Sequence, residues 1–250
     1  MPGSSDEIIS IDLPGMGTVP VRVIRESRRS LRASIGKDHL IFRRPRRTTL
    51  HQDRTHWQWF MDWARRTAKQ QEGRQMAHLR ARMYQNGQEL IVGERTYRIL
   101  MQEADRKTIG GKLLPARTIE IRLPENLPTI LKEQGIRKIL SRVIAQDFLP
   151  AIRQRVIVLN DTYFQQTIRE VRLKYNHSNW GSCSNKGNIN LSTRLLFAPG
   201  FVIDYVIIHE LAHRIEFNHS PRFWRLVENA MPEYEKAEAW LKEHYHECDF

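Results

Sequence analysis

The feature that most constrains this chain is the pentapeptide His209-Glu210-Leu211-Ala212-His213, which is followed six positions later by His219. On a helix, residues four apart lie on one face with their Cβ atoms roughly 5–6 Å apart. Two imidazoles at that spacing can reach one metal ion at about 2.0–2.1 Å, the usual Zn–N distance. The spacing therefore predicts a helix that carries a metal site.

The residues before the motif indicate that this helix is buried. Residues 201–208 form a nearly unbroken apolar run, and a helix that is apolar all round belongs in a core. Histidines and a carboxylate in a buried turn need partners. Hydrogen bonds within the core could supply them, and a shared cation is the alternative that we favour.

His219 is the expected third ligand. The chain must turn back after His213, and Asn218, which tolerates a left-handed backbone, is expected to carry that reversal. Ser220-Pro221 is expected to begin the next helix. Three protein ligands leave one tetrahedral position open, which is typical of a catalytic zinc site. Glu210 flanks the ligands, the place of a general base in such motifs.

Several segments together resemble a known family. They agree in order and spacing from about residue 179 to 224: WGSCS at 180–184, GNINL at 187–191, VIDYV at 202–206, HELAH at 209–213, NHS at 218–220 and FW at 223–224. This run resembles the YgjP-like metallopeptidase family, which is akin to the SprT-like zincins.

The resemblance implies a fold, a cofactor and roles. It implies an α+β, zincin-like metallopeptidase domain in which His209, His213 and His219 bind one Zn²⁺ and Glu210 is catalytic. Nucleotide pyrophosphohydrolase activity is also attributed to the family. The chain departs from the family at Asn179, where relatives usually have Arg, so the resemblance does not fix the substrate preference.

Positive charge is concentrated near the N-terminus. The net charge is +12, and residues 22–47 contain ten basic residues against two acidic ones. Such a segment is either a solvated basic face or a binding site for a polyanion such as nucleic acid or a nucleotide. The candidate phosphate-binding residues are Arg28, Arg29, Arg32, Arg43 and Arg44.

Periodicity predicts three regions. We expect a tail over residues 1–17, a basic β-rich lobe with one long helix over 18–125, and a zincin-like lobe over 126–250 that forms one continuous unit with it. Within them we expect a hairpin at 18–44, a helix at 50–83, a loop at 110–111, strands at 167–174 and 189–195, and helices after Gly135 and at 232–244.

The remaining composition indicates a cytoplasmic protein. No apolar stretch approaches the 18 residues of a membrane span, and the first residues lack the pattern of a signal peptide. The two cysteines, Cys183 and Cys248, form no close pair. Cys183 is expected to be a small buried side chain.

We therefore predict a zinc-dependent metallohydrolase, a metallopeptidase that uses a zinc-bound water and Glu210 as general base. Ile189, Asn190 and Leu191 are the candidate edge strand for an extended peptide or protein substrate, and His177 could stabilise an oxyanion. The alternatives are a nucleotide pyrophosphohydrolase at the same site and a nucleic-acid-associated zinc protein.

Overall fold

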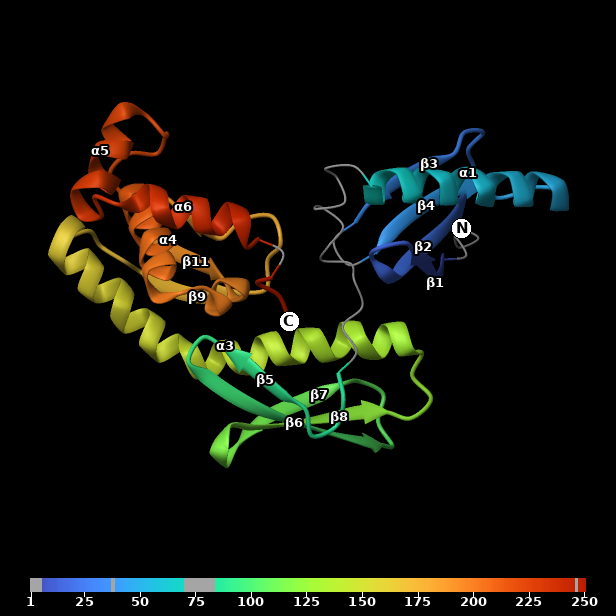
Figure 1. Ribbon diagram of the computed structural model, residues 1–250, viewed down its shortest axis with the longest axis horizontal. Coiled ribbons are helices and arrows are strands. Elements are labelled where there is room, and N and C mark those ends of the chain that lie inside the picture. Colours follow the sequence, from blue (N-terminus) through green and yellow to red (C-terminus); the bar gives the residue numbers. More distant parts are fainter. Residues whose placement is uncertain (1–5, 37–38, 70–83, 246) are drawn as a thin grey trace. The chain divides into compact units, whose positions relative to one another are not determined.

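The computed structural model describes residues 6–36, 39–69, 84–245 and 247–250, and its helices and mixed sheets confirm the α+β class (Figure 1). The chain divides into two compact units, which are treated separately below. Unit 1 contains residues 1–83 and 128–134, and unit 2 contains residues 84–127 and 135–250. This division differs from the predicted boundary at residue 125.

In its described residues, unit 1 contains a four-stranded sheet that packs on a long helix. The strands are β1 (Asp6–Leu13), β2 (Gly17–Glu26), β3 (Arg32–Ile35) and β4 (Leu40–Pro45), in the order β1-β2-β4-β3. The expected tail therefore contains a strand, because β1 pairs antiparallel with β2. The predicted hairpin is present as β3 and β4, while β2 runs parallel to β4.

Helix α1 (Leu50–Lys69) supplies the other half of the unit 1 core. Phe60 stacks on Phe42 of β4 with ring centroids 4.5 Å apart, and both rings are fully buried. Trp57 and Trp63 pack against the same cluster. The part of the predicted helix after residue 69 lies outside the described residues.

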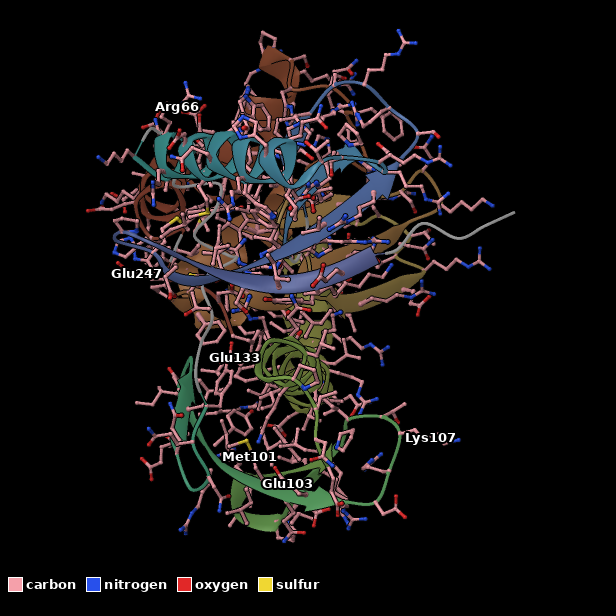
Figure 2. The ribbon with its side chains drawn as sticks, turned by 90° about the vertical axis from the view of Figure 1, so that its right-hand side faces the viewer. Arg66, Met101, Glu103, Lys107, Glu133 and Glu247 are labelled. Atoms are coloured by element: carbon pink, nitrogen blue, oxygen red, sulfur yellow. The ribbon has the colours of Figure 1, made fainter. Side chains whose placement is uncertain are left out.

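The first sheet of unit 2 packs on a long helix. Its strands are β5 (Glu89–Val92), β6 (Arg95–Ala104), β7 (Gly110–Leu114) and β8 (Thr118–Pro124), in the order β5-β6-β8-β7, with a short 3-10 helix η2 (Pro115–Arg117) before β8. The expected loop at Gly110 is the start of β7. Lys107, between β6 and β7, extends away from the ribbon (Figure 2). The sheet shares one apolar cluster with helix α3 (Thr129–Leu159), which explains why these strands belong to unit 2.

Helix α3 begins earlier than predicted, at Thr129 rather than after Gly135, and it continues through Pro150. A π-helical turn η3 (Asn160–Phe164) ends it. The second sheet follows, with strands β9 (Glu170–Lys174), β10 (Gly181–Cys183) and β11 (Asn188–Ser192) in the order β10-β11-β9.

The last elements are helical. They are the 3-10 helix η4 (Thr193–Phe197) and the helices α4 (Gly200–Ala212), α5 (Pro221–Ala230) and α6 (Tyr234–Glu243), which gather beside the second sheet (Figure 1). The structure confirms the predicted burial of α4, because Val206, Ile207 and Leu211 are all buried. Arg155 of α3 holds this helix through a bidentate ion pair with Asp204, in which both N–O distances are 2.6 Å.

Within the described parts of the chain, no helix has the length and apolar character needed to cross a bilayer. Cys183 and Cys248 are both free thiols.

The stacked pair at the centre of unit 1 leads to a stability prediction. Phe42→Ala should lower the free energy of unfolding by about 3–5 kcal/mol, because it removes a fully buried ring and leaves a cavity. Urea denaturation followed by circular dichroism measures the change. Ile91→Ala in β5, at a side chain that is 67% exposed, is the control and should change stability by less than about 0.5 kcal/mol. Equal effects of the two variants would contradict this account of the core.

Candidate metal centre

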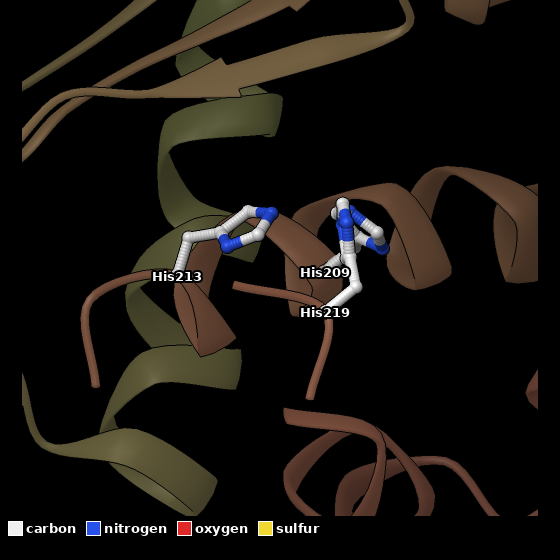
Figure 3. A group of neighbouring side chains, drawn as sticks. All are labelled: His209, His213 and His219. Atoms are coloured by element: carbon white, nitrogen blue, oxygen red, sulfur yellow. The ribbon is translucent and has the colours of Figure 1, made fainter. Parts of the chain in front are cut away.

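Three histidines from two segments converge at the end of α4. His209 lies on α4, His213 caps it, and His219 lies in the connection to α5 (Figure 3). Their ring centroids are 4.9–5.0 Å apart in each pair, and one nitrogen from each lies within 4.8 Å of the others. The Nε2 atoms of His209 and His219 are 3.1 Å apart.

The reversal that returns His219 to α4 is made by short backbone turns. The Glu216 amide donates to the Ala212 carbonyl at 2.9 Å, and the Ser220 amide donates to the Asn218 carbonyl at 2.7 Å. Asn218 is not among the residues with positive φ, so the predicted left-handed conformation is wrong. The predicted start of α5 is confirmed, since the Ser220 hydroxyl accepts from the Phe223 amide at 3.3 Å.

Phe223 forms an apolar floor under the three imidazoles. The centroid of its ring lies 4.9 Å from the ring centroid of His209, 4.6 Å from that of His213 and 4.8 Å from that of His219. The Phe223 side chain is fully buried. Contacts of all three rings with one buried side chain restrict their positions. The packing of α5 against α4 thus sets the geometry of the histidine cluster.

Hydrogen bonds to the Nδ1 atoms orient two of the rings. His213 Nδ1 lies 3.1 Å from the Glu216 carbonyl. His209 Nδ1 lies 3.5 Å from the Tyr205 hydroxyl, which itself donates to Glu238 Oε1 at 2.6 Å. Because the tyrosine uses its proton on Glu238, its oxygen is available to accept from His209. Both rings therefore keep Nε2 for the centre of the cluster, as metal-ligating histidines commonly do.

Tyr205, Glu216 and Glu238 were not among the residues predicted for the site. Tyr205 could have been found, because it lies one helical turn before His209. Glu238 could not, because it comes from α6 and reaches α4 only through tertiary packing.

Burial controls the charge of these groups. It lowers the pKa of His209 to about 3, with further contributions from His213 and His219. It also lowers the pKa of His213 and raises that of Glu210 to about 8. Neutral imidazoles are the form that binds metal. Cys183, expected to be a small buried side chain, is partly buried, and this burial raises its pKa to about 11, which disfavours the thiolate.

Glu210 packs directly against β10. A Cβ atom at Gly181 would lie 2.5 Å from Glu210 Oε1 and 2.8 Å from its Cγ. Any other residue at position 181 would displace the carboxylate. Glycine therefore allows the edge of the sheet to approach the acidic side chain of the motif.

The predicted substrate strand is wrong in its position. β11 is the middle strand, paired with β10 on one side and β9 on the other, so its backbone is not an edge. Ile189 and Leu191 are buried, and Asn190 is partly buried. β10 is the edge strand of this sheet that lies beside the motif helix.

The other predicted site residues lie elsewhere. His177 is buried, and its ring packs edge-on against Tyr175 at 4.6 Å. Arg44 is fully buried in unit 1 and pairs with Asp53 of α1, so it is not available to bind a phosphate. The remaining candidates, Arg28, Arg29, Arg32 and Arg43, are on unit 1 and at least partly exposed.

The donor set fits a divalent transition metal. Three imidazoles that present one nitrogen each, over an apolar floor, match the ligand type and number of a catalytic zinc site. In the described part of the chain these three residues are the group of potential ligands that lies close enough to bind one ion.

The family to which the chain is matched agrees with this chemistry. The family model of the YgjP-like metallopeptidase domain matches residues 29–244. Among solved structures, the chain is similar to the metallopeptidase zymogen abylysin of Pyrococcus abyssi, with 26% identity and a TM-score of 0.34 over 37% of this chain and 93% of that one. The zymogen jannalysin of Methanocaldococcus jannaschii matches with 21% identity and a TM-score of 0.33 over 37% and 94%. No curated protein matches the chain.

The hydrogen bonds behind His209 lead to a prediction about metal affinity. Tyr205→Phe keeps the ring but removes the acceptor for Nδ1, so affinity for Zn²⁺ should fall about 10–100-fold. Competition with a chromophoric chelator measures it. Tyr234→Phe is the matched control, because Tyr234 stacks beside Tyr205 and has no described bond to a histidine. Unchanged affinity in Tyr205→Phe would contradict the orienting role.

Glu210 leads to a prediction about pH. Its pKa is raised in the folded chain, so the metal-free folded state retains a proton that the unfolded state has lost above about pH 4.5. The metal-free wild type should therefore lose stability relative to Glu210→Gln as the pH rises from 4.5 to about 8. The slope should be at most about 1.4 kcal/mol per pH unit, the value for one proton.

Urea denaturation in the presence of a chelator, at pH values across this window, tests the prediction. His209 has a depressed pKa and makes stability fall toward acid in both proteins, so it cancels in the comparison. A stability difference that does not change with pH would show that Glu210 is not held in a protonated form.

Proposed function

Because this chain belongs to the YgjP-like metallopeptidase domain family, we propose that it hydrolyses peptide bonds with one zinc ion held by His209, His213 and His219. The observation that carries the proposal is the convergence of these three imidazoles beside a buried glutamate and an open strand edge. Family membership supplies the class of reaction. The local geometry supports the assignment of roles to the residues.

A zinc ion at this position would polarise the scissile carbonyl and lower the pKa of a water molecule toward about 7. The chain contributes ligands that stay neutral, because burial lowers the pKa values of His209 and His213. Phe223 keeps one side of the cluster dry, which strengthens electrostatic interactions there.

Glu210 is the proposed general base. It accepts a proton from the attacking water and then donates it to the leaving amine nitrogen. Burial raises its pKa to about 8, and a nearby divalent cation favours the carboxylate again. These opposing effects suit a group that must take up and release a proton near neutral pH.

β10 is the proposed binding edge for the substrate. The Ser184 amide donates to the Asn188 carbonyl at 3.0 Å, and the Ser192 amide donates to the Trp180 carbonyl at 2.8 Å. Because backbone groups alternate in an antiparallel pair, those of Gly181 and Cys183 point away from β11. An extended peptide could pair with them and lie beside Glu210.

A partly exposed aromatic ring lies beside the cluster. The ring of Trp224 stacks on that of His219 with their centroids 5.8 Å apart. We expect this ring to contact an apolar side chain of a bound peptide. The pyrophosphohydrolase alternative and the cytoplasmic location stay predictions.

Glu210→Gln should separate metal binding from catalysis. The amide keeps the size of the side chain but cannot accept the proton, so turnover should fall about 10²–10⁴-fold. Zinc content should remain near that of the wild type, whereas His213→Ala should lose the metal. The assays are elemental analysis and cleavage of casein and of a mixed fluorogenic peptide library.

The same preparations should be assayed for pyrophosphate release from nucleoside triphosphates as the competing activity. Peptide cleavage that survives in Glu210→Gln would refute the role of the base. A wild type that releases pyrophosphate and leaves every peptide intact would replace the peptidase proposal with the alternative.

A further inference from the structure

We propose that unit 1 carries a nucleic-acid-binding surface at the end of its sheet where β2 and β4 finish. This arginine surface consists of Arg28, Arg29, Arg32, Arg43, Arg46 and Arg47. The proposal goes beyond the peptidase function and does not depend on it, because all six residues belong to unit 1 and the metal centre belongs to unit 2.

The topology brings separate segments of the sequence together. β2 and β4 are parallel neighbours with Glu26 opposite Pro45, so both strands end at the same edge of the sheet. The Arg28 amide donates to the Glu26 carbonyl at 2.8 Å, and the Arg46 amide donates to the same carbonyl at 3.1 Å. One backbone oxygen therefore holds the two arginine-bearing segments side by side.

β3 adds a third segment. It starts at this edge, and Arg32 lies directly opposite Arg43 in the antiparallel pair of β3 and β4. Like charges directly opposite each other on neighbouring strands are destabilising. The fold tolerates this repulsion, which an anionic partner would relieve.

Acidic residues near this edge include Glu26 of β2 and, at the start of β1, Asp6 and Glu7, which lie opposite Ile24 and Val23 of β2; the six arginines outnumber these three. Among described residues 17–36 and 39–47, Glu26 is the only acidic one, and it pairs with Arg28 at 2.8 Å and Arg43 at 3.5 Å. Asp53, at the start of α1, is engaged by the buried Arg44. Arg29, Arg32, Arg46 and Arg47 are exposed to solvent.

The chemistry of the surface favours nucleic acid. All six cations are arginines, whose planar forks match phosphate oxygens with two hydrogen bonds each. A nucleic acid strand presents phosphates in a row, so several arginines along one edge can be contacted at once. Contacts of this kind position the backbone without reading its sequence.

Binding is measured with the full-length chain by fluorescence anisotropy. The probes are short labelled oligonucleotides of mixed sequence, single-stranded and double-stranded, between about 50 and 200 mM salt. We expect affinity to fall steeply with salt for at least one probe. Comparison of the single-stranded with the double-stranded probes shows which form of nucleic acid the surface binds.

A triple variant tests the location. Arg29→Gln, Arg32→Gln and Arg47→Gln together should weaken binding about tenfold or more. They should also reduce the slope of log affinity against log salt concentration by about 3, since each phosphate contact contributes about 1 to that slope. The matched control neutralises Arg98, Lys107 and Arg117 of unit 2, which are also exposed, and makes the same change in net charge. It should retain most of the affinity and slope.

Two further measurements show whether a loss of nucleic-acid binding comes from misfolding or from loss of the peptidase metal. Circular dichroism and zinc content should be the same in both triple variants and the wild type. No binding at the lowest salt, or equal losses in both triple variants, would overturn the proposal. Tighter binding to phosphatidylserine vesicles than to either oligonucleotide would also overturn it, because the surface would then serve a membrane.

Discussion

The site of this protein depends on the burial of ionisable groups at the end of α4. Three imidazoles crowd over one buried phenylalanine, and a carboxylate is enclosed beside a strand. Burial disfavours the charged forms of His209, His213 and Glu210, so the pKa values of the two histidines fall and that of the carboxyl rises. A single divalent cation would satisfy them together, since it would bind the rings and favour the carboxylate.

The rest of unit 2 can be understood as support for that arrangement. Arg155 of α3 holds Asp204 on the first turns of α4, and Glu238 of α6 orients His209 through Tyr205. α5 supplies the floor, and β10 approaches closely because position 181 is glycine. Each contact comes from a different element, so the precision of the site is a property of the whole unit.

Unit 1 differs from the metal centre in where its charged groups gather. Its core is a sheet on a helix closed by stacked aromatic rings, and its chemistry lies at one edge. The parallel pairing of β2 with β4 gathers arginines that are far apart in the sequence. The chain thus combines a site in which burial favours the uncharged forms of His209, His213 and Glu210 with an exposed sheet edge that carries several arginines.

The sequence alone determined the motif helix, its burial and the identity of the clustered histidines, because helical periodicity and apolar patterning act over a few residues. It also indicated the arginine-rich segment. Tertiary structure decided that β11 is a middle strand, that Arg44 is buried, that β1 pairs with β2, and that Glu238 orients His209 through Tyr205. Those features depend on strand order and on contacts between distant segments, which local patterns do not encode.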